Sequence, residues 1–186
     1  IITLCLVLFA TQGWCGVTVL GTRFEMRAEA KLLNIKISND NENDYIIKST
    51  TDDDNIIITP PIFLLKKDGS NLITLIPKER VKSTEDKIIS LTVTAIPKSL
   101  VKEDANSVSM AVRSHFNVIF RHKEMDESSF KKLTIISDDH SCMLVNNSKF
   151  VFTVSVSDKK NEKGNRIFNI KPSESRKLGA KNTSVC

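Results

Sequence analysis

Apolar and polar residues alternate along residues 107–121, which read Ser-Val-Ser-Met-Ala-Val-Arg-Ser-His-Phe-Asn-Val-Ile-Phe-Arg. Successive side chains point to opposite faces of a β-strand, so this spacing predicts a strand with one apolar face. A strand of this length extends about 50 Å, well beyond the usual five or six residues. Its apolar face carries Val108, Met110, Val112, Phe116, Val118 and Phe120, with Ser114 interrupting the row.

Two interpretations of this strand follow from the pattern. Most apolar rows of this kind belong to a core strand of an all-β domain, packed against a second sheet. An exposed edge strand with an apolar row is instead a template to which another chain adds a strand. The alternation alone leaves both interpretations open.

Shorter alternating segments recur before the long strand and are separated by turn residues. Examples of the turns are the Asn- and Asp-rich residues 39–44 and the Pro60-Pro61 pair, which interrupts strand pairing. No segment predicts a helix longer than two turns. About seven short strands with turns between them are typical of an immunoglobulin-like sandwich. The predicted strands are residues 17–24, 31–38, 45–49, 56–59, 62–65, 71–76 and 88–96.

The pattern divides the chain into four parts. Residues 1–15 contain the apolar run Ile1–Ala10, which predicts a partial signal peptide cleaved before Gly16. Residues 16–122 form the first sandwich, and the charged residues 123–129 form a linker. Residues 130–186 predict a second immunoglobulin-like domain that is partial in this sequence, with strands at 133–136, 143–145, 150–156 and 166–170. Its missing strands would leave an apolar face and sheet edges open.

The leader indicates export of a soluble protein. The apolar run is about half the length needed to span a bilayer, so no membrane insertion is expected after its removal. A lipid anchor on Cys15 is the alternative, which the bulky Trp14 disfavours. Cys142 and Cys186 remain in the exported chain, where they form a disulfide or stay as two unpaired thiols.

Composition argues against catalysis and nucleic-acid binding. The net charge of +5 comes from 27 basic and 22 acidic residues mixed along the chain, without aromatic interleaving. The three histidines, at positions 115, 122 and 140, are isolated, and no nucleophile, zinc or phosphate-binding motif is present. We therefore expect a protein that is not an enzyme and has no cofactor or metal.

Five segments carry a resemblance to a known family. The chain resembles the periplasmic chaperones of the chaperone–usher pathway, which escort fimbrial (pilus) subunits. The match extends in order over nearly all of residues 16–122 and continues weakly at Ile170-Lys171-Pro172. The segments are Gly16-Val-Thr-Val-Leu-Gly-Thr-Arg-Phe24, Asn34-Ile-Lys-Ile-Ser-Asn-Asp40, Ile58-Thr-Pro-Pro-Ile-Phe63, Leu91-Thr-Val-Thr-Ala-Ile-Pro97 and Val112-Arg-Ser-His-Phe-Asn-Val-Ile-Phe-Arg121.

The resemblance implies a boomerang of two immunoglobulin-like β-sandwich domains in the periplasm. Its partners would be pilin subunits, which lack a final strand, and the outer-membrane usher. The chaperone would complete the subunit's sheet by donor-strand complementation. The donated residues would be Val108, Met110 and Val112, with Phe116 and Val118 deeper in the cleft.

The resemblance also implies a cationic anchor for the subunit's C-terminal carboxylate, since charge-assisted hydrogen bonds are strong. Arg23 matches the family's arginine, but Asn117 occupies the position of its lysine. His115, on the same strand face, would contribute a charge when protonated. His122 replaces the usual proline after Arg121. These departures favour a weaker anchor.

Two alternatives to an active chaperone remain from the sequence. One is a divergent or inactive chaperone-like protein, since the anchor has lost a cation. The other is an immunoglobulin-like adhesin or structural subunit, although no short N-terminal donor segment is present. A chaperone forms a one-to-one soluble complex, whereas a structural subunit polymerises.

Overall fold

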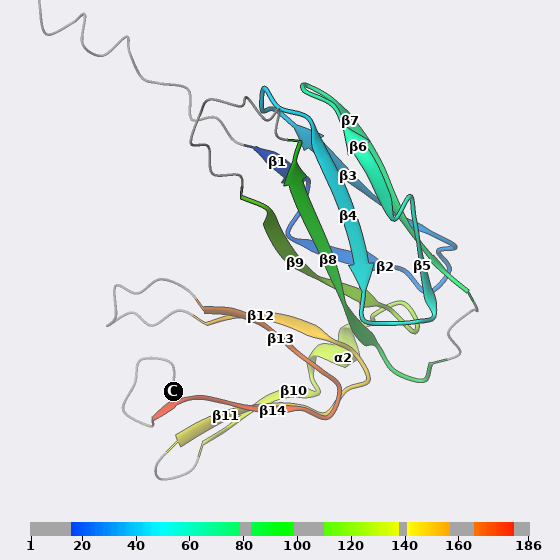
Figure 1. Ribbon diagram of the computed structural model, residues 1–186. Coiled ribbons are helices and arrows are strands. Elements are labelled where there is room, and N and C mark those ends of the chain that lie inside the picture. The colour runs from blue at the N-terminus through cyan, green and yellow to red at the C-terminus, as the bar shows by residue number, and fades with distance from the viewer. Residues whose placement is uncertain (1–15, 79–82, 99–109, 138–140, 157–165, 181–186) are drawn as a thin grey trace, which may run out of the picture.

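The computed structural model describes residues 16–78, 83–98, 110–137, 141–156 and 166–180. The described residues form two β-sandwiches, each with its own hydrophobic core (Figure 1). The all-β prediction, with two immunoglobulin-like domains, is confirmed. The predicted signal peptide lies outside the described residues.

The first sandwich packs a four-stranded sheet against a five-stranded sheet. The first has the order β1 (Val17–Val19), β3 (Leu33–Asn39), β7 (Ser70–Pro77) and β5 (Ile56–Thr59). The second has the order β2 (Arg23–Met26), β9 (Val112–Phe120), β8 (Lys87–Pro97), β4 (Tyr45–Thr51) and β6 (Ile62–Leu65). Neighbouring strands are antiparallel, except that β2 runs parallel to β9.

Alternation in the sequence becomes alternation of burial in these strands. On β3, Ile35 and Ile37 are buried while Asn34 and Lys36 are exposed. The buried face of each sheet supplies one continuous core, because neither apolar face can remain in water. The strands predicted over 31–38, 45–49, 56–59, 62–65, 71–76 and 88–96 are each present, with ends shifted by up to two residues.

The prediction of one strand over residues 17–24 is wrong. The segment forms β1 and β2, which belong to different sheets. Gly21 lies between them at φ +122°, a backbone conformation that residues with a Cβ rarely adopt. A Cβ at this position would also lie 2.8 Å from the Phe24 ring. The glycine therefore lets the chain cross from one sheet to the other.

The second sandwich has a three-stranded and a two-stranded sheet. β11 (Ser141–Asn146) pairs with β10 (Leu133–Ser137) and β14 (Ser175–Ala180), and β12 (Phe152–Val156) pairs with β13 (Arg166–Ile170). Strand β14 was not predicted from the sequence, because Ser-Arg-Lys-Leu-Gly-Ala lacks clear alternation. Its one described core side chain is Leu178, which is 5% exposed.

The segment 123–129, predicted as a linker, contains the beginning of a short helix. Helix α2 (Glu127–Phe130) follows Asp126, whose carboxylate accepts hydrogen bonds from Ser129 N (2.9 Å) and Ser128 Oγ (2.9 Å). The hydrogen bonds from the Ser129 and Ser128 side chains lower the pKa of Asp126 to about 2. This N-cap makes the segment a defined connection between the sandwiches.

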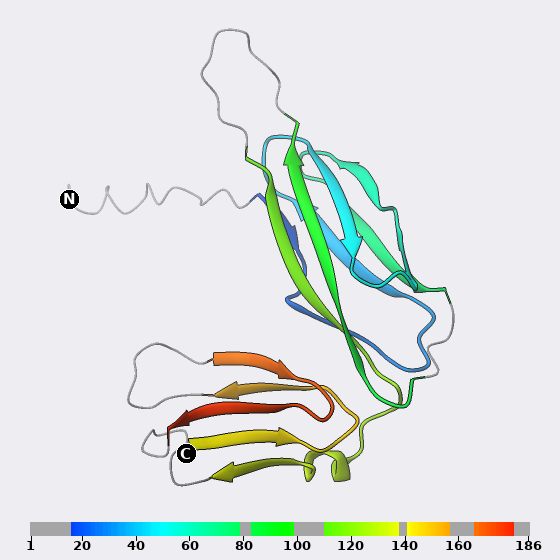
Figure 2. The ribbon, with the colours of Figure 1, turned by 60° about the horizontal axis from the view of Figure 1, so that its bottom comes forward.

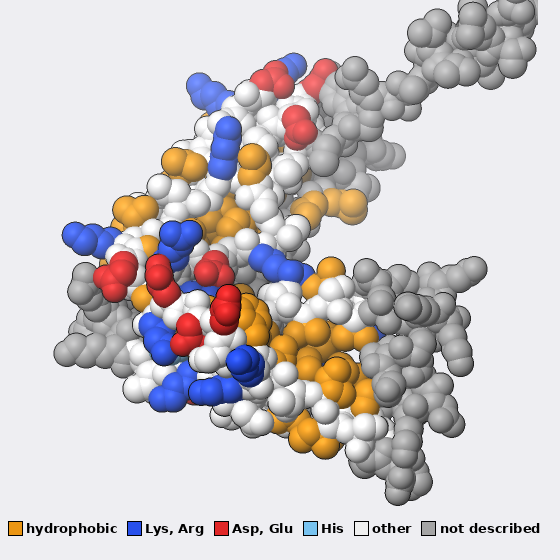
Figure 3. Space-filling view, turned by 180° about the vertical axis from the view of Figure 1, so that it is seen from behind, with side chains coloured by type: hydrophobic (Ala, Val, Ile, Leu, Met, Phe, Trp, Pro, Cys, Tyr) orange, Lys and Arg blue, Asp and Glu red, His pale blue; other side chains and the backbone are white. Residues whose placement is uncertain are grey.

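One face of the second sandwich is left uncovered. Ile135 on β10 pairs in register with Leu144 on β11, yet Leu144 is 4% exposed and Ile135 is 61% exposed. Phe130 is also more than half exposed, and so is Ile136, which points to the opposite face of β10. Hydrophobic side chains gather on this sandwich in the space-filling view (Figure 3). The expectation that the second domain is partial in this sequence stays a prediction.

The two sandwiches meet at an angle, in the expected boomerang arrangement (Figure 2). The long strands β8 and β9 run down to the junction, and the chain continues through α2 into the second sandwich (Figure 2). The junction is polar and well bonded. Its centre is the carboxylate of Asp86, which has no exposed surface.

Four donors from both sides of the junction surround the Asp86 carboxylate. Arg121 Nη1 (2.5 Å) and Val151 N (2.9 Å) donate to Oδ2, while His122 N (3.0 Å) and Nδ1 (2.7 Å) donate to Oδ1. Asp86 N donates to Lys149 O at 2.8 Å, and the His122 ring stacks on Phe150 at 4.6 Å. Hydrogen bonds and ring stacking from the first sandwich thus fix residues 149–151, the segment of the second sandwich that leads into β12.

Candidate functional site

Strand β9 changes from an open edge to an interior strand along its length. Residues 112–116 pair with β8, from Val112 opposite Ala95 to Phe116 opposite Leu91. Strand β2 joins the other side of β9 only at Asn117, which pairs with Arg23. Among the described residues, the backbone of 112–116 therefore has one unpaired side, to which another strand can add.

The predicted donor residues divide into exposed and buried positions along this strand. Met110 is 74% exposed and Val112 is 59% exposed. Strand β9 begins at Val112, so Met110 precedes it, and Val108 lies outside the described residues. The prediction of one strand over 107–121 therefore holds for 112–120 within the described part. The exposed residues lie beside the open edge, where strand donation needs them.

Two predicted donor residues take part in the domain's own core to different degrees. Phe116 is partly buried, and its ring contacts the Phe24 ring edge-on with 5.7 Å between centroids. Val118 is 0% exposed and belongs to the first core, so the prediction that it binds a subunit is wrong. Once β2 covers the edge at Asn117, the apolar row turns from a free surface into core.

Arg23 and Asn117 lie side by side on the outer face of the sheet. They are register partners in the parallel β2–β9 pair, and both side chains are exposed. Ser90 of β8 pairs with Asn117 from the other side, so Arg23, Asn117 and Ser90 form one row across three strands. The predicted anchor pair is thus brought together, with one cation and one neutral amide.

His115 lies one step further along the same face of β9. Its Nδ1 shares a hydrogen bond with Thr92 Oγ1 at 3.0 Å. The imidazole is therefore oriented by β8, and it keeps its position two residues from Asn117. The structure places His115 next to the anchor row without showing a direct contact to it.

A cavity of about 590 Å³ separates this row from the second sandwich. Its first wall includes Asn117, Ser90 and Asp52, and its second wall includes Lys171 and Arg176. Ile88 and Ile167 add apolar surface to the two walls. We call this cavity the cleft. It combines the hydrogen-bonding groups of Asn117 and Ser90 with basic side chains, and it begins at Asn117, where the open edge of β9 ends. This arrangement suits the polar end of an extended chain.

The comparison with known families decides between the open interpretations. Residues 16–126, more than half of the chain, match the family described as pili and flagellar-assembly chaperone, PapD N-terminal domain. The chain belongs to this chaperone family. No curated protein sequence matches it.

Solved chaperone structures share the fold of this pilus-assembly chaperone. The SafA pilin–SafB chaperone complex of Salmonella enterica is 15% identical with a TM-score of 0.72, covering 93% of this chain and 87% of that chain. The CupB2 chaperone of Pseudomonas aeruginosa is 15% identical with a TM-score of 0.68, covering 86% of each. The CsuC–CsuE chaperone–tip subunit complex of Acinetobacter baumannii is 14% identical with a TM-score of 0.64, covering 89% of this chain and 90% of that chain.

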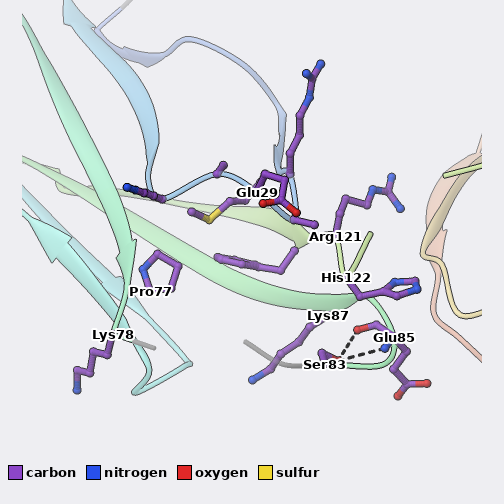
Figure 4. A pocket seen from close by; sticks show the side chains of 14 residues that line it. Glu29, Pro77, Lys78, Ser83, Glu85, Lys87, Arg121 and His122 are labelled. Carbon is purple, nitrogen blue, oxygen red and sulfur yellow. Dashed lines mark hydrogen bonds between the residues drawn. The ribbon is translucent and has the colours of Figure 1, made fainter. Parts of the chain in front are cut away.

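A second cavity of this chaperone lies at the base of the first sandwich. Glu29 lies on one side of it, with Lys78 and Lys87 on another (Figure 4). Lys87 Nζ contacts Asp53 at 2.7 Å, and Arg121 contacts both Asp86 and Glu25. Two of the cations that line this cavity, Lys87 and Arg121, therefore already have carboxylate partners.

Two features of this chaperone were absent from the sequence analysis. The buried Asp86 stands in the charged run Lys-Ser-Thr-Glu-Asp-Lys, which reads as a solvated loop. Lys171 belongs to the weak continuation of the family match at Ile170-Lys171-Pro172 but was assigned no part in binding. The available signal for the junction is an Asp immediately before one strand, together with the Arg and His that directly follow the neighbouring strand. Nothing in the sequence signalled Lys171.

Other predicted features are only partly covered by the structure. Cys142 is buried and disulfide-bonded, whereas Cys186 lies outside the described residues, so their pairing stays a prediction. Within the described ranges no cluster of three or more His, Cys, Asp or Glu side chains offers a metal site. No helix in those ranges is long and apolar enough to cross a bilayer.

Proposed function

We propose that this protein is a periplasmic chaperone that stabilises fimbrial subunits by donating β9 and delivers them to an outer-membrane usher. It is a binding protein, not an enzyme. The observation that carries the proposal is the change along β9 from an exposed, half-paired edge at Val112 to core at Val118. Such a strand has both the backbone groups and the apolar side chains that complete another sheet.

The cleft supports the same proposal, because it lies at Asn117, where the open edge of β9 ends. An added strand beside residues 112–116 reaches the row of Arg23 and Asn117 where β2 begins. A chain terminus at that point places its carboxylate next to the Arg23 guanidinium, which offers bidentate hydrogen bonds. Asn117 donates from its amide without adding charge. Edge and anchor therefore act on one extended partner.

Partner complexes in similar folds agree with this assignment. Two of the similar structures are complexes, one of a chaperone with a pilin and the other of a chaperone with a tip subunit. By this likeness we assign fimbrial subunits as the partners, with the exported leader giving a periplasmic location. The family membership favours a chaperone over an adhesin or structural subunit.

Delivery to an usher needs a surface that stays exposed while β9 is occupied. The sheet order puts β6 at the edge opposite β2 and β9. Ile46 of β4 pairs with Leu64 of β6, and both are more than a third exposed, as is the nearby Ile62. This apolar surface remains available to a second protein when a subunit occupies the cleft.

The test is periplasmic co-expression of the full-length protein with a pilus subunit from its own operon, followed by purification of the complex. Wild type should give a soluble one-to-one complex. Val112→Glu and Arg23→Ala should each reduce its yield about tenfold or more, through a charge in the subunit's core or a lost carboxylate contact. Ile136→Glu, at a similarly exposed position of the second sandwich, is the matched control and should leave the complex unchanged.

Each outcome distinguishes one part of the proposal. A complex that survives Val112→Glu would refute strand donation. A soluble complex with Leu64→Glu, combined with loss of pili on the cells, would support usher delivery, whereas normal pili would refute this usher surface. Polymers of the chain alone, with no complex, would favour the structural-subunit alternative. Complex formation by Asn117→Lys but not by wild type would identify an inactive chaperone.

A further inference from the structure

The first sandwich offers one cation at the anchor row. Arg23 is followed across the sheet by the neutral Asn117 and Ser90. Asp52 lies further along, where its Oδ1 accepts a hydrogen bond from Ser90 N at 2.7 Å. A carboxylate bound at this row therefore meets a single positive charge and a nearby negative charge from this side. Any further positive charge that stabilises the carboxylate must come from the second wall of the cleft, on the second sandwich.

Lys171 is held firmly at the second wall. Its backbone N donates to Glu174 Oε2 at 2.7 Å, and its carbonyl accepts from Asn146 Nδ2 at 2.9 Å. Asn146 is 0% exposed and also donates to Phe150 O at 2.7 Å. The backbone of the turn is thus tied to the core of the second sandwich. This fixes the point from which the Lys171 side chain extends.

The charges around Lys171 are already engaged with one another. Arg176 stacks on the Phe168 ring, with Cζ 4.6 Å from the centroid, and its Nε lies 3.7 Å from Glu174 Oε1. Glu174 Oε2 accepts from the Lys171 backbone. By contrast, the Lys171 ammonium makes no hydrogen bond or ion pair with any described residue. It is the second-wall cation of the cleft that remains for a ligand.

We propose that Lys171 supplies, from the second sandwich, the second positive charge for a C-terminal carboxylate bound at Arg23 and Asn117. The inference rests on the proposed function, because it assigns a further residue to the same site. The ligand class is an extended peptide that ends in a free carboxylate. Its terminus is held between two domains, so its affinity depends on the junction that sets their angle.

The experiment uses two fluorescently labelled 12-residue peptides with apolar residues at alternate positions. One ends in a free carboxylate and its twin ends in an amide. Fluorescence anisotropy with the full-length protein gives the Kd of each. Lys171→Gln should weaken binding of the free acid about 5- to 10-fold, the effect of one partly exposed charge-assisted contact, and leave the amide unchanged.

Three further variants separate an anchor from a structural role. Lys177→Gln, an exposed lysine of the same sandwich that does not line the cleft, is the matched control and should change neither Kd. Lys171→Arg should keep the preference for the free acid. Adding Asn117→Lys to Lys171→Gln should restore it, because the new cation lies in the same row as Arg23.

The outcomes distinguish the two levels of the proposal. A preference for the free acid that is lost in Arg23→Ala but unchanged in Lys171→Gln overturns the role of Lys171 and leaves the proposed function intact. Equal weakening of acid and amide by Lys171→Gln assigns the residue a structural role and also overturns the inference. Absence of binding by either peptide in every variant counts against the proposed function itself.

Discussion

Replacing Asp86 by alanine should destabilise the protein more than any single surface change at the junction. The substitution removes a fully buried carboxylate and leaves His122 Nδ1 and Val151 N without their acceptor. Arg121 Nη1 keeps only its hydrogen bond to Val151 O. Removing one partner of a buried charged pair costs about 3–5 kcal/mol. With a urea m-value of about 2–3 kcal/mol per M, the unfolding midpoint should fall by about 1–2 M.

The control uses the same arginine. Glu25 Oε2 contacts Arg121 Nη2 at 2.8 Å, but the Glu25 side chain is 49% exposed. Glu25→Ala should therefore cost about 1 kcal/mol or less. Urea unfolding of both variants, followed by far-ultraviolet circular dichroism, makes the comparison. Equal midpoints for the two variants would refute the reasoning that burial makes Asp86 the centre of the junction.

The pH dependence gives an independent check on the same carboxylate. Burial of Asp86 opposes its ionisation, but the hydrogen bonds from His122, Val151 and Arg121 together outweigh this effect and lower its pKa below 3.8. A lowered pKa in the folded state means that the stabilisation is complete above the unfolded-state pKa of about 3.9 and is lost as pH falls further. The stability difference between wild type and Asp86→Asn should therefore be fully present at pH 5 and shrink below about pH 3.9.

Two further predictions concern the first sandwich. Val118→Ala should lower the free energy of unfolding by about 2–3 kcal/mol, whereas Val112→Ala should change it by about 0.5 kcal/mol or less, since only the first leaves a cavity in the core. Equal losses in urea unfolding would contradict the assignment of Val118 to the core. Gly21→Ala should cost about 1–3 kcal/mol because its φ is +122° and the new Cβ meets the Phe24 ring. A thermal midpoint equal to that of wild type would show that this crossing tolerates a side chain.

The presence of most strands could be predicted, because it depends on the local alternation of apolar and polar residues. Burial of every second side chain follows from the sequence at β3 and β8, and the structure confirms it. The crossing at Gly21 was not predictable, because the apolar pattern continues through it and only the backbone conformation separates β1 from β2. Strand β14 was missed for the opposite reason. It is held by pairing with β11, while its own residues show little alternation.

The position of the candidate site could be predicted from the sequence, but the full set of residues that form it could not. The resemblance placed Arg23 and Asn117 together, and their register confirms that they are neighbours. Alternation could not distinguish Val112 from Val118, because both lie on the same face and differ only in whether β2 covers the edge. Lys171 comes from the other domain. Its approach to Asn117 across the cleft depends on the angle at the junction, which no local pattern contains.

The short strand β2 has a consequence for the length of any added strand. Because β2 runs parallel to β9 and begins at Arg23, it already occupies the edge of β9 from Asn117 onward. A partner strand that adds beside residues 112–116 and ends in a carboxylate at Arg23 must run in the same direction as β2. The two would then lie end to end along one edge. Strand β2 thus fixes the register of a guest strand independently of any side-chain pocket.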